Sequence, residues 1–236
     1  MLNIIKYELY RMFNRLSTYV LLMVMCLYNL TGMGELAGSF TDITLQVFEI
    51  GFQMVILTIF IILFTCDELN TGYIKALITK IKRYQLVIAN VVVSLVFTMI
   101  MFALTMVQTF LYMQISGYTG FGSASRFATG MILMLFLHTA FGVFISMLVY
   151  LFKNKIIPII VGIIMVVGVL LFVPISADTS NGFLKMLLNC TIMGQISSLC
   201  DSMTASSYAA PILNITVTLG VCIIVSCLVF QKKDIK

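Results

Sequence analysis

Six long apolar segments constrain this chain more than any other feature, because each is about as long as a bilayer is thick. A membrane-spanning helix needs about 20 mainly apolar residues. The segments cover residues 17–36, 45–66, 86–115, 127–152, 156–175 and 211–230. They predict an all-α integral membrane protein with six transmembrane helices. The third segment is longer than a bilayer requires, so we expect it to tilt or to project into water.

The composition excludes a soluble protein. Of the 236 residues, 61% are hydrophobic and 10% are charged, whereas soluble domains carry about 25% charged residues. So few charges cannot coat a water-facing surface of this size. Six spans with short connections fill the chain and leave no room for a second soluble domain. We therefore expect residues 1–236 to form one transmembrane domain.

The first 16 residues have the pattern of an amphipathic helix. When residues 1–16 are placed on a helix, six apolar residues fall on one arc: Leu2, Ile5, Leu9, Met12, Phe13 and Leu16. The polar residues lie outside that arc: Lys6, Glu8, Arg11, Asn14 and Arg15. This pattern predicts a helix lying in the membrane interface. The alternative is the charged start of a signal peptide, but no convincing cleavage site follows the apolar run.

The basic residues are distributed unevenly between the two sides. Alternate connections place all but two of the 14 lysines and arginines on the side of both termini. The two on the other side are Arg126 and Lys185. The positive-inside rule then predicts cytoplasmic N- and C-termini. On a soluble protein the net charge of +5 would suggest nucleic acid, but here we expect no nucleic-acid partner.

Residues 176–210 connect the fifth and sixth apolar segments and are partly apolar. We interpret them as one or two short helices on the outer side. Cys190 and Cys200 lie in this stretch; the sequence leaves a disulfide between them open, and free thiols are the default. The six cysteines show no CxxC spacing, so no metal site is predicted.

No catalytic or nucleotide-binding pattern is present, so we expect a chain that is not an enzyme and that binds no cofactor itself. The phosphate-binding, zinc-protease and nucleophile-elbow motifs are all missing. Several polar residues lie inside the apolar segments, where facing lipid would be costly. The candidate lining of a substrate path is Glu49, Gln53, Asn90, Gln108 and His138. The alternative is hydrogen bonding between helices, which is the expectation for His138. Glu49 and Gln53 are four residues apart and would share one helix face.

Residues 67–85, between the second and third segments, carry the most informative pattern. The stretch opens with Asp67 and Glu68, and three of its four cations lie near its end, the order that a helix dipole favours. Ile74, Leu77, Ile78 and Ile81 repeat at helical spacing. A short cytoplasmic helix with one apolar face can dock into a groove of a partner protein. The alternative, a solvated loop, does not explain the apolar periodicity.

The chain resembles the ABC-2 type transporter permeases. The family pattern in this loop, E-x-x-x-G-[TY]-[IL]-K-x-L followed by Arg, corresponds to Glu68, Gly72, Tyr73, Ile74, Lys75, Leu77 and Arg83. Many members have a proline shortly before the arginine, where this chain has Lys80-Ile81. The end of the chain, from Phe230 to Ile235, is similar to the closing pattern of the family. The resemblance covers essentially the whole sequence.

The resemblance implies the ABC-2 exporter fold, with residues 70–83 as a coupling helix in a cleft of a separate ATPase. Two ATPase subunits and a second permease chain, identical or homologous, would complete the transporter in the bacterial cytoplasmic membrane. ATP and Mg²⁺ would bind to the ATPase. The family includes lantibiotic-immunity and bacitracin-resistance permeases and exporters of amphipathic peptides.

The charge of the outer side bears on the substrate. Carboxylates outnumber cations there: Glu35, Asp42, Glu49, Asp178 and Asp201 face only Arg126 and Lys185. A negative outer mouth would suit a cationic peptide, although positive-inside sorting alone explains the asymmetry equally well. The sequence leaves open a permease for drugs or ions and, as a rival, the six-span substrate-binding subunit of a vitamin importer. An intramembrane enzyme is the third alternative.

Overall fold

The computed structural model describes residues 1–36, 38–49, 51–70, 83–117, 120–152, 154–178, 191–192, 194–196 and 208–232. In these parts of the chain every regular element is a helix and none is a strand. The helices are α1 (Leu2–Phe13), α2 (Leu16–Gly32), the 3₁₀ turn η1 (Met33–Glu35), α3 (Phe40–Glu49), α4 (Phe52–Asn70), α6 (Arg83–Ser116), α7 (Ala124–Phe152), α8 (Ile156–Asp178) and α11 (Ala209–Lys232). The predicted all-α class is confirmed.

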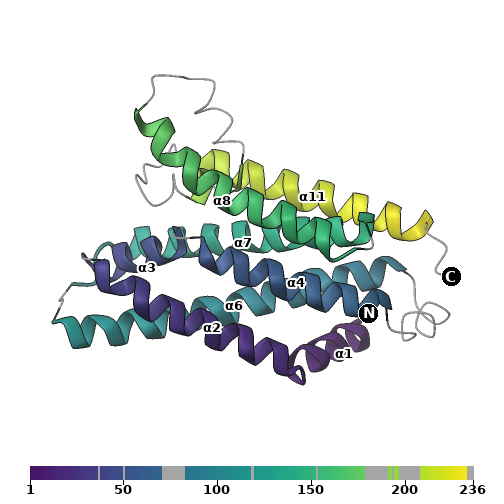
Figure 1. Cartoon of the computed structure of the whole chain (residues 1–236), viewed down its shortest axis with the longest axis horizontal. Coiled ribbons are helices and arrows are strands. Elements are labelled where there is room, and N and C mark those ends of the chain that lie inside the picture. Colours follow the sequence, from purple (N-terminus) through teal and green to yellow (C-terminus); the bar gives the residue numbers. More distant parts are fainter. Residues whose placement is uncertain are drawn as a thin grey trace.

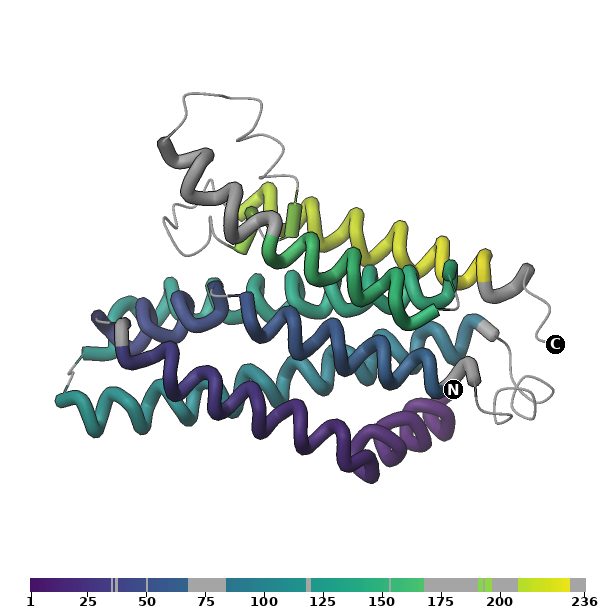
Figure 2. Tube along the Cα trace, viewed as in Figure 1, coloured from purple at the N-terminus to yellow at the C-terminus, as the bar shows by residue number. Residues whose placement is uncertain are grey.

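The long helices lie alongside one another in a bundle, and α1 lies at one end of it (Figures 1 and 2). Helix α7 is central and contacts α3, α4, α6, α8 and α11. In its most apolar 18-residue window 72% of the residues are buried, against 11% for α11. A helix that is apolar on all sides must be surrounded by protein or lipid. Other helices therefore cover most of α7. Most of α11 is not covered by the rest of the described chain and is free to contact lipid or another apolar surface.

Among the described residues, three helices are long and apolar enough to cross a membrane: α6 over Tyr84–Ser116, α7 over Ala124–Phe152 and α11 over Ala209–Val229. Helices α3 and α4 give a fourth span if the bent pair is counted as one. Helix α2, with 17 residues, and the part of α8 over Ile156–Val167 are shorter apolar helices. Membrane-spanning helices are therefore supported, and the described part of the chain gives three or four candidates for the six expected spans. The 34 residues of α6 agree with the expectation of an unusually long third segment.

The second predicted segment is not one continuous helix. Helix α3 ends at Glu49, α4 begins at Phe52, and the two are bent by 52°. Gly51 lies in the break with a φ of 78°, in a region that glycine enters without a steric penalty. The prediction that Glu49 and Gln53 share one helix face is therefore wrong, because i, i+4 spacing applies only within one helix.

Helix α1 forms where the amphipathic pattern places it, but its buried face differs from its apolar arc. Ile4, Glu8 and Met12 are buried, and α1 packs against α6. Leu2 and Phe13, both on the apolar arc, are exposed. One side of α1 therefore packs on the bundle, and part of its apolar arc remains available to lipid. Glu8, which the sequence pattern places outside the apolar arc, is nevertheless buried.

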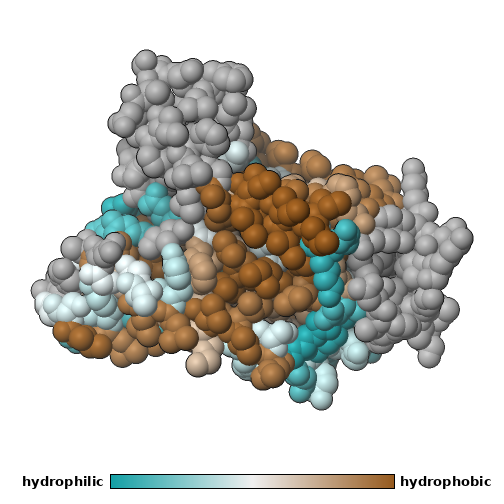
Figure 3. All heavy atoms as spheres, viewed as in Figure 1, coloured by the Kyte–Doolittle hydropathy of each residue, from teal (hydrophilic) through white to brown (hydrophobic). Residues whose placement is uncertain are grey.

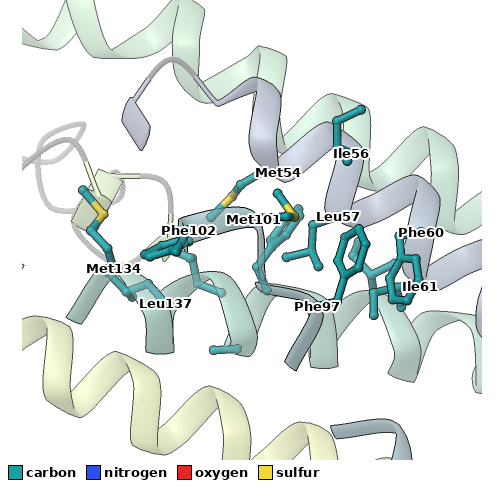
Figure 4. Close-up of a cluster of buried hydrophobic side chains, with 14 of the residues drawn as sticks. Met54, Ile56, Leu57, Phe60, Ile61, Phe97, Met101, Phe102, Met134 and Leu137 are labelled. Carbon is teal, nitrogen blue, oxygen red and sulfur yellow. The ribbon is translucent and has the colours of Figure 1, made fainter. Parts of the chain in front are cut away.

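Helices α4, α6 and α7 form the core of the bundle. The rings of Phe60 on α4 and Phe97 on α6 stack with their centroids 3.7 Å apart. Met54, Met101 and Leu137 pack into the same cluster (Figure 4). Such interlocked side chains hold helices together in a bilayer, where lipid already solvates apolar groups and packing replaces the hydrophobic effect.

The start of α1, the end of α4, the start of α6 and the end of α11 lie at one end of the bundle (Figure 1). On the face shown in Figure 3, hydrophobic residues cover the middle of the bundle. Hydrophilic residues form a stripe toward the end with the termini and a second group near the opposite end. This arrangement matches an apolar slab between two aqueous phases. The predicted outer segment, residues 176–210, lies mainly outside the described residues, and so do Cys190 and Cys200.

Candidate functional site

Charged side chains from three parts of the chain meet at the last turns of α4. Arg15, just before α2, lies 3.1 Å from Asp67 through Nη1 and Oδ2. Lys155, just before α8, lies 3.3 Å from the other carboxylate oxygen of Asp67. Arg11 on α1 forms an ion pair of 3.1 Å with Glu8. We call Glu8, Arg11, Arg15, Asp67 and Lys155 the charged junction.

The two arginines of the junction also bind the backbone of α4. Arg11 Nη2 donates to the carbonyl oxygen of Phe64 at 3.2 Å, and Arg15 Nη1 donates to that of Leu63 at 3.5 Å. The guanidinium of Arg11 lies 4.0 Å from the centroid of the Phe64 ring, within the range of a cation–π interaction. Helix α1 is thereby fixed to the final part of α4 by charge, hydrogen bond and ring contact together.

Glu8 is the most buried carboxyl group of the junction, with none of its side chain exposed. Burial raises the pKa of Glu8 above its ordinary value of 4.5, and the nearby Arg11 and Arg15 oppose this shift. Removal from water therefore outweighs the attraction of the two cations. A buried carboxylate is stable only beside such partners. The packing of α1 around Glu8 therefore depends on where Arg11 and Arg15 lie.

The predicted coupling segment begins where the junction ends. Asp67 is followed by the last three residues of α4, and α6 starts at Arg83. Gly72, Tyr73, Ile74, Lys75 and Leu77 lie outside the described residues, as do the side chains of Glu68 and Arg83. The structure therefore places both ends of this segment at the end of the bundle where α1 begins (Figure 1), and α1 packs against α6.

Four polar side chains meet between α2, α4 and α6. Asn29 Nδ2 donates to Thr105 Oγ1 at 3.2 Å and to Gln108 Oε1 at 3.1 Å. Gln53 Nε2 donates to the same Thr105 oxygen at 3.1 Å. Gln108 Nε2 donates to the carbonyl oxygen of Cys26 at 2.9 Å. Thr105 is thus the shared acceptor that joins three helices.

The structure brings together only part of the predicted substrate path. Gln53 and Gln108 belong to the network around Thr105, whereas Asn90 donates instead to the hydroxyl of Tyr150 on α7. Glu49 is half-buried at the end of α3. Hydrogen bonds between helices are observed for Gln53, Asn90 and Gln108, the kind of contact that the packing interpretation expects.

His138 does not make the expected hydrogen bond between helices. Its Nδ1 lies 2.9 Å from the carbonyl oxygen of Met134 on its own helix. Its Nε2 is buried and has no hydrogen-bond partner among the described residues. The rings of Phe48 and Phe102 meet the imidazole edge-on, with centroids 5.8 and 5.2 Å away. The Nε2 atom of His138 is therefore buried without a hydrogen bond to the described residues, on a ring that contacts two phenylalanine rings.

At the opposite end of the bundle, α3 is joined to the first turn of α7 and to the connection that precedes it. Arg126 Nη1 lies 3.1 Å from Asp42 Oδ1, and Thr41 Oγ1 donates to the carbonyl oxygen of Phe121 at 2.7 Å. Gly122 has a φ of 81°, and a Cβ there would lie 2.6 Å from Ser39 Oγ. Asp42 is thus already paired with a cation, so it adds little to the predicted negative outer mouth.

Sequence reasoning missed Thr105 and the charged junction. A threonine on a membrane helix satisfies its hydroxyl with its own helix, as Thr105 does with Met101 at 3.0 Å, so its type gives no sign of a cross-helix role. Glu8 and Arg11 are three positions apart, but the contacts that join this pair, Arg15 and Lys155 to α4 link residues 48 to 88 positions apart in sequence. The charges themselves were visible as topological signals, but nothing in their spacing shows that they meet. No group of metal-binding side chains occurs among the described residues.

Comparison with known proteins adds a family but no activity. The model of a family described as "Protein of unknown function (DUF2705)" matches residues 50–236. No curated protein matches the chain. The family match covers α4, α6, α7, α8 and α11. They include the helices that form the core of the bundle, and α4 contributes Asp67 to the charged junction. The chain belongs to the DUF2705 family.

Proposed function

We propose that the chain is the membrane subunit of an ABC exporter that moves amphipathic or antimicrobial peptides out of the membrane. In this proposal it crosses the bacterial cytoplasmic membrane six times, with both termini in the cytoplasm and α1 in the interface. The chain is not an enzyme and binds no cofactor. Two copies of a separate ATPase bind ATP and Mg²⁺, and a second permease chain, identical or homologous, completes the transporter.

The observation that carries the proposal is the charged junction. It joins α1, the start of α8 and the end of α4 at the point where the predicted coupling segment leaves the bundle. A displacement applied to that segment would act on α4 through the backbone and on α1 and α8 through Arg11, Arg15 and Lys155. Packed and hydrogen-bonded elements of this kind can carry coupling between distant sites.

The amphipathic pattern of the coupling segment supplies the docking element. Ile74, Leu77, Ile78 and Ile81 would form the face that enters the cleft of the ATPase, because apolar residues at helical spacing anchor a helix in a groove. Glu68, Gly72, Tyr73, Lys75 and Arg83 correspond to the family pattern around this face. The peptide class of the substrate rests on the resemblance to immunity and resistance permeases.

Co-purification tests the partner. If the chain is an ABC permease, an ATPase with a Walker motif, encoded next to it, should purify with it. Consistent failure of any such subunit to associate would show the proposal to be wrong. Retention of a small vitamin through purification would instead favour the importer alternative.

A substitution in the coupling segment tests the mechanism. Ile74→Asp should lower peptide-stimulated ATP hydrolysis, because a charge on the apolar face opposes docking, while membrane insertion is unchanged. Thr79→Asp is the matched control, since Thr79 lies in the same segment but outside the apolar stripe. Equal ATP hydrolysis by both variants would contradict the docking face.

A further inference from the structure

A groove of about 190 Å³ opens between α6 and α7 on the outside of the bundle. Its lining side chains are all apolar and include Met99, Met106 and Met131. Ala103, the smallest of them, leaves space between Met99 and Met106, which lie about one turn before and after it on α6. Methionine side chains are flexible and adapt to ligands of irregular shape. The groove therefore suits a hydrocarbon chain that arrives from the bilayer.

Phe102 forms the wall of the groove toward the core, and His138 lies behind it. The Phe102 ring lines the groove and also meets the imidazole of His138 edge-on, with centroids 5.2 Å apart. Phe102 lies near Met134 and Leu137 (Figure 4). These two residues belong to the turn of α7 that directly precedes His138. Leu135, another lining residue, precedes His138 by nearly one turn. A single aromatic ring thus separates the groove from the imidazole.

The hydrogen bond of Nδ1 fixes the role of the other nitrogen. A backbone carbonyl can only accept, so Nδ1 carries the proton that binds the Met134 oxygen. In neutral histidine Nε2 is then an acceptor. It has no partner among the described residues and lies on a side chain that is 0% exposed.

An apolar residue would fill this position without an unused acceptor. A buried polar atom without a partner lowers stability, and a polar residue inside a membrane span is by default a functional candidate. His138 lies midway along α7, near the depth at which membrane transporters bind their substrates. Phe48, which also contacts His138, is next to the break between α3 and α4. Interrupted helices of this kind accompany binding sites in transporters.

We propose that the groove and His138 form a binding site for an amphipathic molecule that carries a hydrogen-bond donor, such as a hydroxyl or amine, on a hydrocarbon chain. The chain lies among the methionines of the groove. The Phe102 ring rotates aside, and the donor binds Nε2 of His138. The site receives its ligand sideways from the bilayer.

This inference rests on the proposed function in one respect, that the bound ligand is also the molecule that is exported. Binding itself needs neither ATP nor the ATPase. The test therefore uses the full chain in lipid nanodiscs without either. Failure of the ATPase to co-purify would leave the binding result unchanged. Failure of binding would leave the result of co-purification unchanged. The two proposals can thus fail separately.

The chain contains no tryptophan, which makes an introduced one a clean fluorescent reporter. Ile132→Trp places it at the mouth of the groove, and Val217→Trp places it on the exposed face of α11 as the control. The two positions are similarly exposed, at 56% and 53%. The probe is 12-bromododecan-1-ol, whose bromine quenches nearby tryptophan. We expect saturable quenching for Ile132→Trp and only non-saturable partitioning for Val217→Trp. The same partitioning curve for both would overturn the site.

The methyl ether of the probe has the same chain but no donor. In the Ile132→Trp background it should bind about fivefold more weakly than the alcohol, the worth of one neutral hydrogen bond. Adding His138→Leu should remove this difference by weakening the alcohol alone, whereas adding His138→Gln, which keeps an acceptor, should retain part of it. Equal affinity of alcohol and ether for the chain with native His138 would overturn the role of that residue, even if its variants do not fold.

Two further variants test the path to His138. Ala103→Leu should weaken the alcohol and the ether equally, because it fills the groove. Phe102→Ala should tighten the alcohol more than the ether, because the donor then reaches Nε2 without displacing the ring. No selective gain for the alcohol would contradict the position assigned to Phe102.

Discussion

Replacing Thr105 by valine removes the shared acceptor that joins α2, α4 and α6. The hydroxyl of Thr105 accepts from Asn29 at 3.2 Å and from Gln53 at 3.1 Å. Asn29 keeps its bond to Gln108, whereas Gln53 loses the partner of its Nε2. Its Oε1 already has no hydrogen-bond partner among the described residues. The buried amide of Gln53 therefore carries most of the cost.

The size of the effect follows from the number of bonds lost. Hydrogen bonds between membrane helices contribute about 0.6 kcal/mol on average and up to about 1.7 kcal/mol. A donor left unpaired in the interior costs about 1–3 kcal/mol. With two cross-helix bonds removed, Thr105→Val should lower the free energy of unfolding by about 1–3 kcal/mol.

Thr109→Val is the matched control. Both threonines are buried on α6, and each donates to the carbonyl oxygen four residues earlier. Neighbouring-helix donors bind only to Thr105 in the described residues. The carbonyl that loses the Thr109 hydroxyl keeps its helical N–H, so Thr109→Val should cost only about 0.5 kcal/mol, the low end of the contribution of one hydrogen bond.

The assay is unfolding of both variants by SDS in mixed micelles, followed by far-ultraviolet circular dichroism. Equal unfolding free energies for Thr105→Val and Thr109→Val would show that the network does not stabilise the bundle. Loss of transport by Thr105→Val without a change in stability would favour the substrate path over the packing interpretation.

Three further predictions concern the junction and the helix contacts. Because the folded-state pKa of Glu8 is raised, the folded chain binds more protons than the unfolded chain between pH 4.5 and that pKa, so stability falls as pH rises there. Glu8→Gln should reduce this slope in thermal unfolding midpoints, and an unchanged slope would assign it to other groups. Asp67→Asn should leave the unfolding midpoint almost unchanged, because its partly exposed ion pairs contribute below about 1 kcal/mol, yet should lower peptide-stimulated ATP hydrolysis; wild-type hydrolysis would contradict the junction's role. Gly162→Ala should destabilise by about 1–3 kcal/mol, since its Cβ would lie 2.6 Å from Thr58 Cγ2. Gly220→Ala has open space and should cost nothing in the same SDS titration.

Helix positions were predictable because a bilayer imposes a length and a polarity on each segment. The predicted starts at residues 17, 86, 127 and 156 fall within three positions of the starts of α2, α6, α7 and α8. The break near Gly51 was not predictable, since a single glycine inside an apolar run is common in membrane helices. Only the backbone, with a positive φ at this residue, shows that the helix stops.

Contacts between distant residues account for the rest of what the sequence did not show. Glu8 lies outside the apolar arc of residues 1–16, yet it is buried on α1, which packs on α6. Gln53 and Gln108 were identified as polar residues inside spans, yet their common partner Thr105 has no distinguishing local feature. The order of charges and the apolar spacing singled out residues 67–85, and the structure adds the ion pairs of Asp67, the first residue of this stretch.

Site-specific photocrosslinking at residue 74 tests most directly whether this chain works through a separate ATPase. A benzophenone amino acid replaces Ile74 in the full chain, cells are irradiated, and adducts are identified by mass spectrometry. Our proposal predicts a light-dependent adduct with an ATPase subunit that carries a Walker motif, and none from the same substitution at Thr79. Labelling of an Ile74→Cys variant by a membrane-impermeant maleimide from outside the cell, beyond that of the native chain and with no ATPase adduct, would contradict it.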